Sequence, residues 1–402
     1  MSCAKLLHLL ARCAADRDRH ADTRQIIRFK DRREYNHFVR QLQAGQPTAS
    51  LKASIRKLPL IHAVSFRGRA LPPQEISGVS FIEQDMRIRM HGVTDTVELI
   101  TAKPPVRIPW GIRRIRAPKV WKYTTGQAVK VAVIDTGADF HHPALRHALD
   151  YGVNLLQRRT LPWDDNGHGT HIAGTIAAAA SDGRGIWGTA PNTIICPVKA
   201  FDMNGSAYVS DIIEGIDWCV RNGVRVINMS FGMSEPSRAF MEAVRNAHRL
   251  GVIIVASAGN DGKQRGSLDY PAQYPGTIAV GSTGRNGRPA AFSNRGKGVI
   301  LYAPGKHILS TWLNQSYAVL SGTSMSTSHV SGAIALALSL RPKLTPDRIR
   351  QLLYATGRPL KGYRTGRWRE IDAFRLIKAV RRQKYASKSP LTSARALPRP
   401  QA

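Results

Sequence analysis

The chain has 402 residues, 43% of them hydrophobic, and a formal net charge of +32 at pH 7. This length suits one large domain with a small one, and the hydrophobic content supports a packed core, which excludes a fibrous or wholly low-complexity chain. No apolar run approaches the roughly 18 residues of a transmembrane helix, so we expect no membrane span. The charge favours nonspecific contact with polyanions, although a basic surface without a bound partner explains it equally well.

Residues 1–22 form an N-terminal segment with no clear role. Lys5 precedes a leucine-rich stretch, but His8 and Arg12 interrupt that stretch, so it makes a poor signal peptide. Without a clear export signal we expect a cytoplasmic or non-classically exported protein, and secretion stays open. None of the four cysteines lies in a Cys-x-x-Cys pair, so we predict neither a disulfide framework nor a zinc site.

Residues 23–91 have the pattern of a small α/β domain. In chain order we predict a strand, a helix, a second strand broken by Pro59, a short helix and a half-exposed strand, over 25–29, 33–42, 53–66, 72–79 and 80–90. Residues 92–107 show no periodicity and contain Pro104 and Pro105, which predicts a linker.

After the linker, short β-branched runs of the buried parallel type alternate with helical patterns. The predicted strands cover 129–134, 193–198, 224–229, 252–256 and 277–280, and the predicted helices cover 169–180, 209–221, 238–250 and 346–354. This alternation predicts an α/β domain over 108–366, with a mainly parallel sheet between helices on both faces. Residues 367–402 form a basic extension with one amphipathic helix and a tail that we expect to be disordered.

Four polar residues stand at strand ends or helix starts of this domain, where sites in open α/β sheets gather. Asp135 and Asn260 each follow a buried strand, His168 opens a helix between two glycines, and Ser324 begins an apolar helix. Each has an ordinary alternative: a turn acid, a turn amide, a packed surface imidazole or an N-cap hydroxyl. His171, close to His168 in the chain, is expected to be structural.

Taken together, these residues supply the groups of nucleophilic acyl transfer. A serine attacks a carbonyl carbon, a histidine takes the serine proton, an aspartate orients the imidazole, and an amide donates to the oxyanion. Because all four roles are present in suitable positions, the combination favours catalysis over four unrelated structural roles.

The sequence resembles the subtilisin-type serine proteases in three motifs that follow the family's order. They are Val133-Ile-Asp-Thr-Gly137, His168-Gly-Thr-His-Ile-Ala-Gly174 and Gly322-Thr-Ser-Met325. The resemblance implies a three-layer α/β fold and a serine endopeptidase that works through an acyl-enzyme, with Asp135, His168 and Ser324 as the triad. Asn260 and the backbone N–H of Ser324 would form the oxyanion hole, and no cofactor is implied.

The resemblance also implies where an extended substrate binds. A peptide would pair with strand edges by β-augmentation, which gives affinity with broad tolerance of sequence. The candidate substrate-binding residues are Ser230, Phe231, Gly232, Gly205, Ser206, Ala258, Gly259 and Asp269.

Asp269 would lie at the floor of the S1 pocket, which receives P1, the residue on the N-terminal side of the cut bond. A carboxylate there would pair with Lys or Arg at P1, and Arg87, Arg89 or Lys103 would then be natural processing sites. The alternative is that Asp269 points away or pairs with Arg265.

By length, position and order of elements, residues 23–91 resemble the family's propeptide of the inhibitor I9 type, an intramolecular chaperone and inhibitor. The resemblance implies a zymogen that cuts itself in or near 92–107. We expect the enzyme to be a monomer that acts on proteins and peptides.

The sequence departs from the family pattern at two places. Ser326 and Ser328 replace the usual Ala and Pro near the nucleophile, but both are small, so the helix start should survive. Ala144 stands where many subtilisins have an acidic calcium ligand, and the loop 181–186 offers one carboxylate and a cation. Calcium needs several oxygen ligands, usually with net negative charge, so we predict no metal there.

A second hypothesis is a non-catalytic protein that uses the protease fold and its positive charge to hold a polyanion. The complete triad argues against it, and no recognisable nucleic-acid module is present in the sequence. An active endopeptidase is therefore the favoured function.

Overall fold

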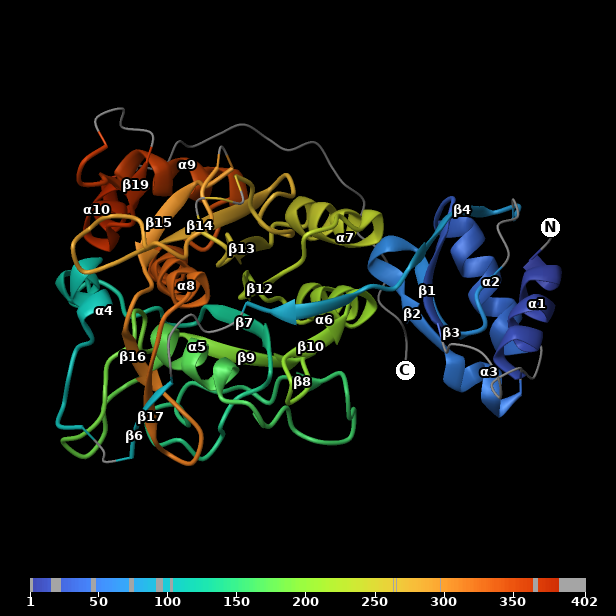
Figure 1. Ribbon diagram of the computed structural model, residues 1–402, viewed down its shortest axis with the longest axis horizontal. Coiled ribbons are helices and arrows are strands. Elements are labelled where there is room, and N and C mark those ends of the chain that lie inside the picture. The colour runs from blue at the N-terminus through green and yellow to red at the C-terminus, as the bar shows by residue number, and fades with distance from the viewer. Residues whose placement is uncertain are drawn as a thin grey trace.

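The computed structural model describes residues 3–15, 23–44, 48–71, 76–91, 97–101, 104–262, 264, 266–296, 298–363 and 368–382. It consists of an N-terminal module beside a larger α/β domain (Figure 1). The first half of the short helix predicted over 72–79, and the tail from residue 383, lie outside the described residues. The second half is not helical, because residues 77–78 form a turn and strand β4 (Val79–Gln84) begins directly after it.

The larger domain is built on a nine-stranded sheet in the order β18, β19, β15, β14, β13, β11, β7, β9, β8. Their bounds, in that order, are Arg358–Pro359, Arg369–Glu370, Leu301–Pro304, Thr277–Thr283, Ile253–Ser257, Val226–Met229, Lys130–Asp135, Ile194–Lys199 and Val153–Asn154. Each neighbouring pair is parallel except β18 with β19. The mainly parallel sheet predicted from the strand and helix alternation is confirmed.

Helices cover both faces of this sheet and make three layers (Figure 1). One face carries α5 (His168–Ala177), α8 (Thr323–Leu340), α9 (Pro346–Thr356) and α10 (Ala373–Arg382), and the other carries α6 (Val209–Arg221) and α7 (Arg238–Arg249). Successive side chains of a strand point to opposite faces, so Val131 joins the first layer and Ala132 the second. This two-sided burial explains why the strands read as continuous apolar runs.

Helix α8 is buried over almost its whole length. Its side chains are buried from Thr323 to Leu338, as expected of a helix that is apolar on all sides. Small residues allow the close approach, because a β-carbon on Gly332 would lie 2.6 Å from Cβ of Thr189. The packing of α8 therefore fixes Ser324, in its first turn, at one edge of the sheet.

Shorter elements complete the larger domain. They are α4 (Trp110–Arg114), η2 (Ala117–Lys119), β10 (Ser206–Tyr208), β12 (Phe231–Gly232), β16 (Ile308–Thr311) and β17 (Tyr317–Leu320). Among the described residues, no helix is both long and apolar enough to cross a membrane.

The N-terminal module is an antiparallel sheet covered by helices. Its strands, in the order β2, β3, β1, β4, are Ile55–Leu58, Ala63–Gly68, Thr23–Phe29 and Val79–Gln84, and its helices are α1 (Cys3–Ala15), α2 (Arg32–Ala44), α3 (Ala49–Ser54) and η1 (Pro59–Ile61). Leu6 and Leu10 of α1 are buried in one cluster with Phe38 and Phe66. The segment without a role in the sequence is therefore part of this module's core.

The continuous strand predicted over 80–90 is two strands in different sheets. β4 completes the N-terminal sheet, whereas β5 (Arg87–Met90) pairs with β10 and β12 of the larger domain. The break has a physical reason: the Asp85 carboxylate accepts hydrogen bonds from Ser210 at the start of α6, which turns the chain toward the larger domain. The prediction of an extended chain was right, and its continuity was wrong.

The predicted linker also contains a short strand. β6 (Glu98–Ile100) pairs with β17 of the larger domain. Three residues are too few for an alternating pattern, so the sequence carried no signal for this strand.

Candidate active site

Asp135 and His168 meet at one edge of the sheet. Asp135 is the last residue of β7 and His168 the first of α5, and His168 Nδ1 lies 2.8 Å from Asp135 Oδ1. Both residues are buried, with 0% and 3% of the surface exposed. The Thr136 N–H also donates to Asp135 Oδ1, at 2.9 Å, which fixes the carboxylate. The imidazole is therefore held with Nε2 directed away from the acid.

The environment of His168 favours its charged form. Burial alone lowers the pKa of His168, but the negative charge and hydrogen bond of Asp135 outweigh burial, so the pKa is raised above its ordinary value. Among the described residues, no side chain or backbone group forms a hydrogen bond with His168 Nε2. That nitrogen is the atom left to exchange a proton with a bound partner.

The side chain of Asp164 holds the turn before His168. Asp164 Oδ1 accepts from the N–H groups of Asn166 and Gly167, and Asp164 Oδ2 accepts from the N–H of Thr170. Gly167 has a φ of +105°, and a β-carbon there would lie 2.4 Å from the Trp312 ring. Glycine is required on this side of His168 for both reasons.

Ser324 lies in the first turn of α8, where backbone N–H groups have no partner within the helix. Its hydroxyl donates to the carbonyl oxygen of Ser230 at 3.1 Å, and its residue surface is only 1% exposed. Helices α5 and α8 pack against each other. The hydroxyl is thus buried at a helix N-terminus, in the positive potential that favours developing negative charge.

Asn260 is anchored at the same helix start. Its Oδ1 accepts from the N–H of Thr323 at 3.0 Å and from Thr323 Oγ1 at 2.8 Å. The oxygen is occupied there, and the Nδ2 group is the donor of this amide. A β-carbon on Gly322 would lie 3.2 Å from Asn260 Nδ2. This contact is tight, so a larger residue at position 322 would push against the amide.

The neighbouring histidines have structural roles. His171 Nε2 lies 3.0 Å from the Ile308 carbonyl and 3.2 Å from the Ala318 carbonyl, and burial lowers the pKa of His171 to about 3. Burial likewise lowers the pKa of His329, to about 4. Both rings are therefore neutral near pH 7. His171 connects α5 with β16 and β17, which is the structural role expected for it.

Four of the predicted substrate-binding residues, Gly205, Ser206, Phe231 and Gly232, flank strand β5 on its two sides. β5 runs antiparallel between β10 and β12, and the Met90 N–H donates to the Gly205 carbonyl at 2.9 Å. Arg89 is opposite Ser206 on one side and Gly232 on the other, and Met90 is opposite Phe231. The two edges thus hold an extended segment of the chain itself.

At the end of β5, the side chain of His91 enters a pocket that contains Asp269. His91 Nε2 lies 2.7 Å from Asp269 Oδ2, and His91 Nδ1 lies 2.8 Å from Ser257 Oγ. A β-carbon on Gly259 would lie 2.6 Å from Asp269 Oδ2, and the Ala258 carbonyl accepts from the Asp269 N–H at 3.0 Å. Asp269 thus contacts the His91 ring at the end of β5.

Two of the basic residues considered for Asp269 have side chains that face solvent. Arg87 and Arg89 lie within β5 with exposed side chains. Arg265 and Lys103 lie outside the described residues. Sequence reasoning missed His91 and Ser257, and a polar residue just after a strand-like stretch was the only available signal for His91.

Two carboxylates of the N-terminal module reach helix starts of the larger domain. Glu83 accepts hydrogen bonds from Ser237 Oγ at 2.6 Å and from the Arg238 N–H at 3.0 Å, at the start of α7. Asp85 accepts from the Ser210 N–H at 2.9 Å and from Ser210 Oγ at 2.6 Å, at the start of α6. Burial raises the pKa of Asp85 to about 6, although the Ser210 bonds oppose that shift. Both act as helix caps supplied from another module.

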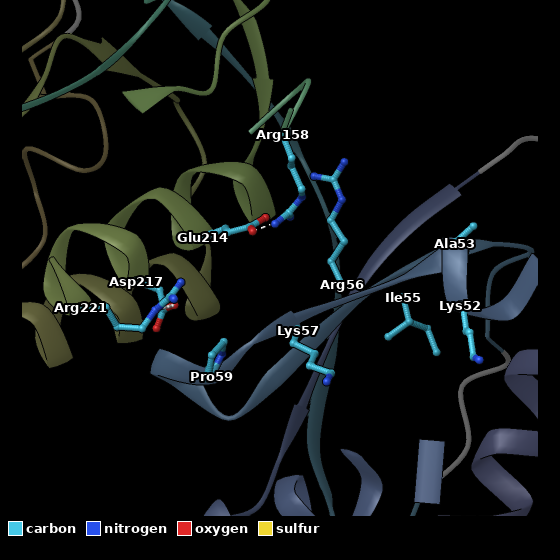
Figure 2. Close-up of a pocket in the computed structure, with 10 residues that line it drawn as sticks. All are labelled: Lys52, Ala53, Ile55, Arg56, Lys57, Pro59, Arg158, Glu214, Asp217 and Arg221. Carbon is cyan, nitrogen blue, oxygen red and sulfur yellow. Dashed lines mark hydrogen bonds and ion pairs between the residues drawn. The ribbon is translucent and has the colours of Figure 1, made fainter. Parts of the chain in front are cut away.

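The two modules also meet through opposite charges along α6. Arg56 of β2 forms an ion pair with Asp211, and Arg24 lies 3.7 Å from the same carboxylate. Figure 2 shows the open pocket of about 510 Å³ beside this contact, where Arg56 lies near the Arg158–Glu214 pair. The basic N-terminal module therefore rests on an acidic helix face.

The residues near Ala144 do not suit calcium. Ala144 is buried, and the nearby pocket is lined by Pro143, Ser181, Asp182, Arg184 and Tyr317, with one carboxylate and one guanidinium. In the part of the chain that the structure describes, no cluster of three or more His, Cys, Asp or Glu side chains could hold a metal. A calcium ion needs several oxygens with net negative charge, which this set does not provide.

Comparison with known proteins identifies the family. A model of the subtilase family, Peptidase S8, matches residues 126–372. An alkaline protease of Alkalihalobacillus alcalophilus is 35% identical over 351 residues, which cover 85% of this chain and 87% of the relative. Subtilisin Savinase of Lederbergia lenta is 42% identical over 254 residues, which cover 63% of this chain and 92% of the relative. The chain therefore belongs to the subtilase family and is a subtilisin-like serine endopeptidase.

Proposed function

We propose that Asp135, His168 and Ser324 are the catalytic triad of this endopeptidase. The observation that carries the proposal is the 2.8 Å contact of Asp135 with His168 Nδ1, which leaves His168 Nε2 as the proton acceptor. Ser324 Oγ attacks the substrate carbonyl carbon while its proton passes to His168. His168 then returns the proton to the leaving amine, and water hydrolyses the resulting ester.

Asn260 Nδ2 and the Ser324 N–H stabilise the oxyanion in this proposal. The anchoring of Asn260 Oδ1 by Thr323 supports it, because the amide is fixed before the substrate arrives. Preorganised donors of this kind stabilise the transition state without reorganisation cost. The residues Ser230–Gly232 and Gly205–Ser206 hold the substrate backbone, and Ala258, Gly259 and Asp269 line the pocket for the P1 side chain.

The N-terminal module acts as a propeptide and inhibitor of the same chain. Strand β5 occupies both cleft edges, which is where a substrate would bind. We assign residues 23–91 to this propeptide, joined by α1, and 108–366 to the catalytic domain. The enzyme acts as a monomer, and its positive charge adds nonspecific contact with polyanions, testable by the salt dependence of heparin binding.

Labelling with a fluorophosphonate tests the proposed nucleophile. The wild-type chain should react covalently after its propeptide has been removed, and Ser324→Ala should not react. Ser326→Ala is the matched control, because Ser326 is also buried at the start of α8 and should leave labelling intact. Equal labelling of wild type and Ser324→Ala would overturn the assignment.

A further inference from the structure

Strand β5 presents a defined peptide bond to Ser324. The register pairs Met90 with Phe231 and Arg89 with Gly232 in antiparallel order. One further step along both strands brings His91 opposite Ser230, whose carbonyl oxygen accepts the hydrogen bond of Ser324 Oγ. The carbonyl group of His91 is therefore brought next to the proposed nucleophile.

The side chain of His91 fills the pocket that would hold the P1 residue. The His91 side chain is 8% exposed and the Asp269 side chain 6% exposed, so their contact excludes most water. A β-carbon on Gly232 would lie only 2.3 Å from His91 Nε2, so the ring lies directly against the glycine backbone. The flat, short side chain of His91 is therefore enclosed where it contacts Asp269.

Both ring nitrogens of His91 have a polar partner at hydrogen-bond distance. Asp269 Oδ2 lies 2.7 Å from Nε2, and Ser257 Oγ lies 2.8 Å from Nδ1. Ser257 Oγ also lies 3.4 Å from the Met229 carbonyl, to which it donates, so it is free to accept from Nδ1. Two acceptors at the two nitrogens match an imidazole ring better than a linear or apolar side chain.

Other P1 side chains would fit this pocket less well. A phenyl ring would remove the hydrogen bond that His91 makes with the buried Asp269 carboxylate, and losing a hydrogen bond to a charged group is costly. Lys and Arg extend further from the backbone than His, and His91 already reaches Asp269. The longer chains would have to fold within the pocket to make the same contact.

We infer that Asp269 and Ser257 make this enzyme select histidine at P1, and that it cuts its own chain between His91 and Gly92. This inference rests on the proposed function. In the step, Ser324 Oγ bonds to the His91 carbonyl carbon, the bond to the Gly92 nitrogen breaks, and His168 protonates that nitrogen. Water then hydrolyses the ester and leaves a carboxylate on His91.

Peptide substrates test the P1 selection directly. We would compare kcat/KM of the mature wild-type enzyme on Ile-Arg-Met-Xaa substrates with a fluorogenic leaving group, where Xaa is His, Gln, Phe, Lys or Arg. A hydrogen bond to a charged group corresponds to an effect of roughly 10- to 100-fold, so His should exceed each of the others by at least about tenfold. Cleavage of Phe, Lys or Arg as fast as His would overturn the inference while leaving the protease function intact.

Variants of the pocket assign the preference to its two polar residues. Asp269→Asn should lose at least about tenfold in kcat/KM on the His substrate, with a smaller change on Phe, and Ser257→Ala should show a weaker form of the same effect. Asp261→Asn is the matched control, because Asp261 is an exposed acid in a neighbouring turn. An unchanged His-to-Phe ratio in Asp269→Asn would contradict the role of Asp269.

The cut site is tested on the full chain. The Ser324→Ala chain serves as substrate for added mature wild-type enzyme, and N-terminal sequencing of the product should begin at Gly92. His91→Phe in that substrate should slow the cut at least about tenfold. A product that begins elsewhere would overturn the site. Absence of all cleavage, with no fluorophosphonate labelling of the wild type, would instead reject the proposed function and the inference with it.

Discussion

Helix starts serve opposite purposes in two regions of this molecule. At the proposed catalytic centre, the starts of α5 and α8 carry His168 and Ser324, and side chains of the same domain, such as Asp164 and Asn260, accept from their first N–H groups. At the contact with the N-terminal module, the starts of α6 and α7 are capped by Asp85 and Glu83. The positive potential of a helix start thus surrounds the proposed reacting side chains in one region, and in the other it attracts a carboxylate from another module.

The difference extends to how each region is held. The catalytic centre is fixed by short contacts within one buried domain, such as those of Asp135 and Asn260. The module contact relies on charged groups, such as Arg28 and Glu242, that regain water when the module leaves. We therefore expect substitutions at the centre to change the rate of catalysis and substitutions at the contact to change the duration of inhibition.

The largest effect should come from Asp135→Asn. An amide would hold His168 in the wrong tautomer, so kcat should fall about 10⁴-fold, as in other enzymes with this triad. Steady-state kinetics on a peptide substrate would measure the loss. Asp139→Asn, a buried acid on the same loop, is the control and should stay within a few-fold. A loss below about tenfold in Asp135→Asn would contradict its role.

Asn260→Ala should give the next largest effect. Removal of one oxyanion donor lowers kcat by about 10²- to 10³-fold, a range established on the equivalent donor of subtilisin, so it is carried over here from that relative. The value of KM should change little, because the donor acts on the transition state. Asn192→Ala, at an exposed position, is the control. A raised KM with unchanged kcat would show a binding role instead.

The pH dependence of kcat/KM tests the role of His168 as a proton acceptor. Only neutral His168 accepts the serine proton, so activity should rise with pH by about tenfold per unit on the acid side. Burial lowers the pKa of His168, but the charge and the hydrogen bond of Asp135 together outweigh it, so the midpoint should lie above the roughly 6.5 of an unperturbed histidine. A pH profile of the mature enzyme checks this, and a midpoint below that value would contradict it.

Substitutions of the capping carboxylates probe the module contact. Glu83→Ala or Asp85→Ala removes hydrogen bonds to a helix start, worth about 1–2 kcal/mol, so inhibition should weaken by roughly tenfold. The lag before activity appears in the full chain should shorten accordingly, with kcat of the mature enzyme unchanged. Gln43→Ala, at an exposed position on α2, should keep the wild-type lag. A changed kcat would mean that the caps act on the centre.

The smallest effect is expected from a calcium chelator. The site near Ala144 offers one carboxylate and one cation, so EDTA should leave the melting temperature of the mature enzyme within error. Thermal unfolding with and without EDTA measures it, with Savinase treated in parallel as a reference from the same family. A fall of several degrees in this enzyme would show that a metal binds at other residues.

Much of the catalytic domain could be predicted because its signals are local. Buried parallel strands read as apolar runs, and the residues just beyond them, such as Asp135, fall at one sheet edge by topology alone. The glycines beside His168 and the small residues of α8 are also visible in the sequence. They mark positions where a larger side chain would collide with neighbouring atoms. The strand over 80–90 was mispredicted as continuous because its break depends on Ser210, which is distant in the chain.

The sequence by itself determined the family, the layered architecture and the four residues proposed for chemistry. Each of these can be recognised from a short motif or from the local spacing of apolar residues. Only the tertiary structure decided which residue meets Asp269. The sequence offered Arg and Lys as partners, whereas the register of β5 between β10 and β12 brings His91 into that pocket. Register across strands far apart in the chain depends on long-range packing and hydrogen bonds, which no local pattern encodes.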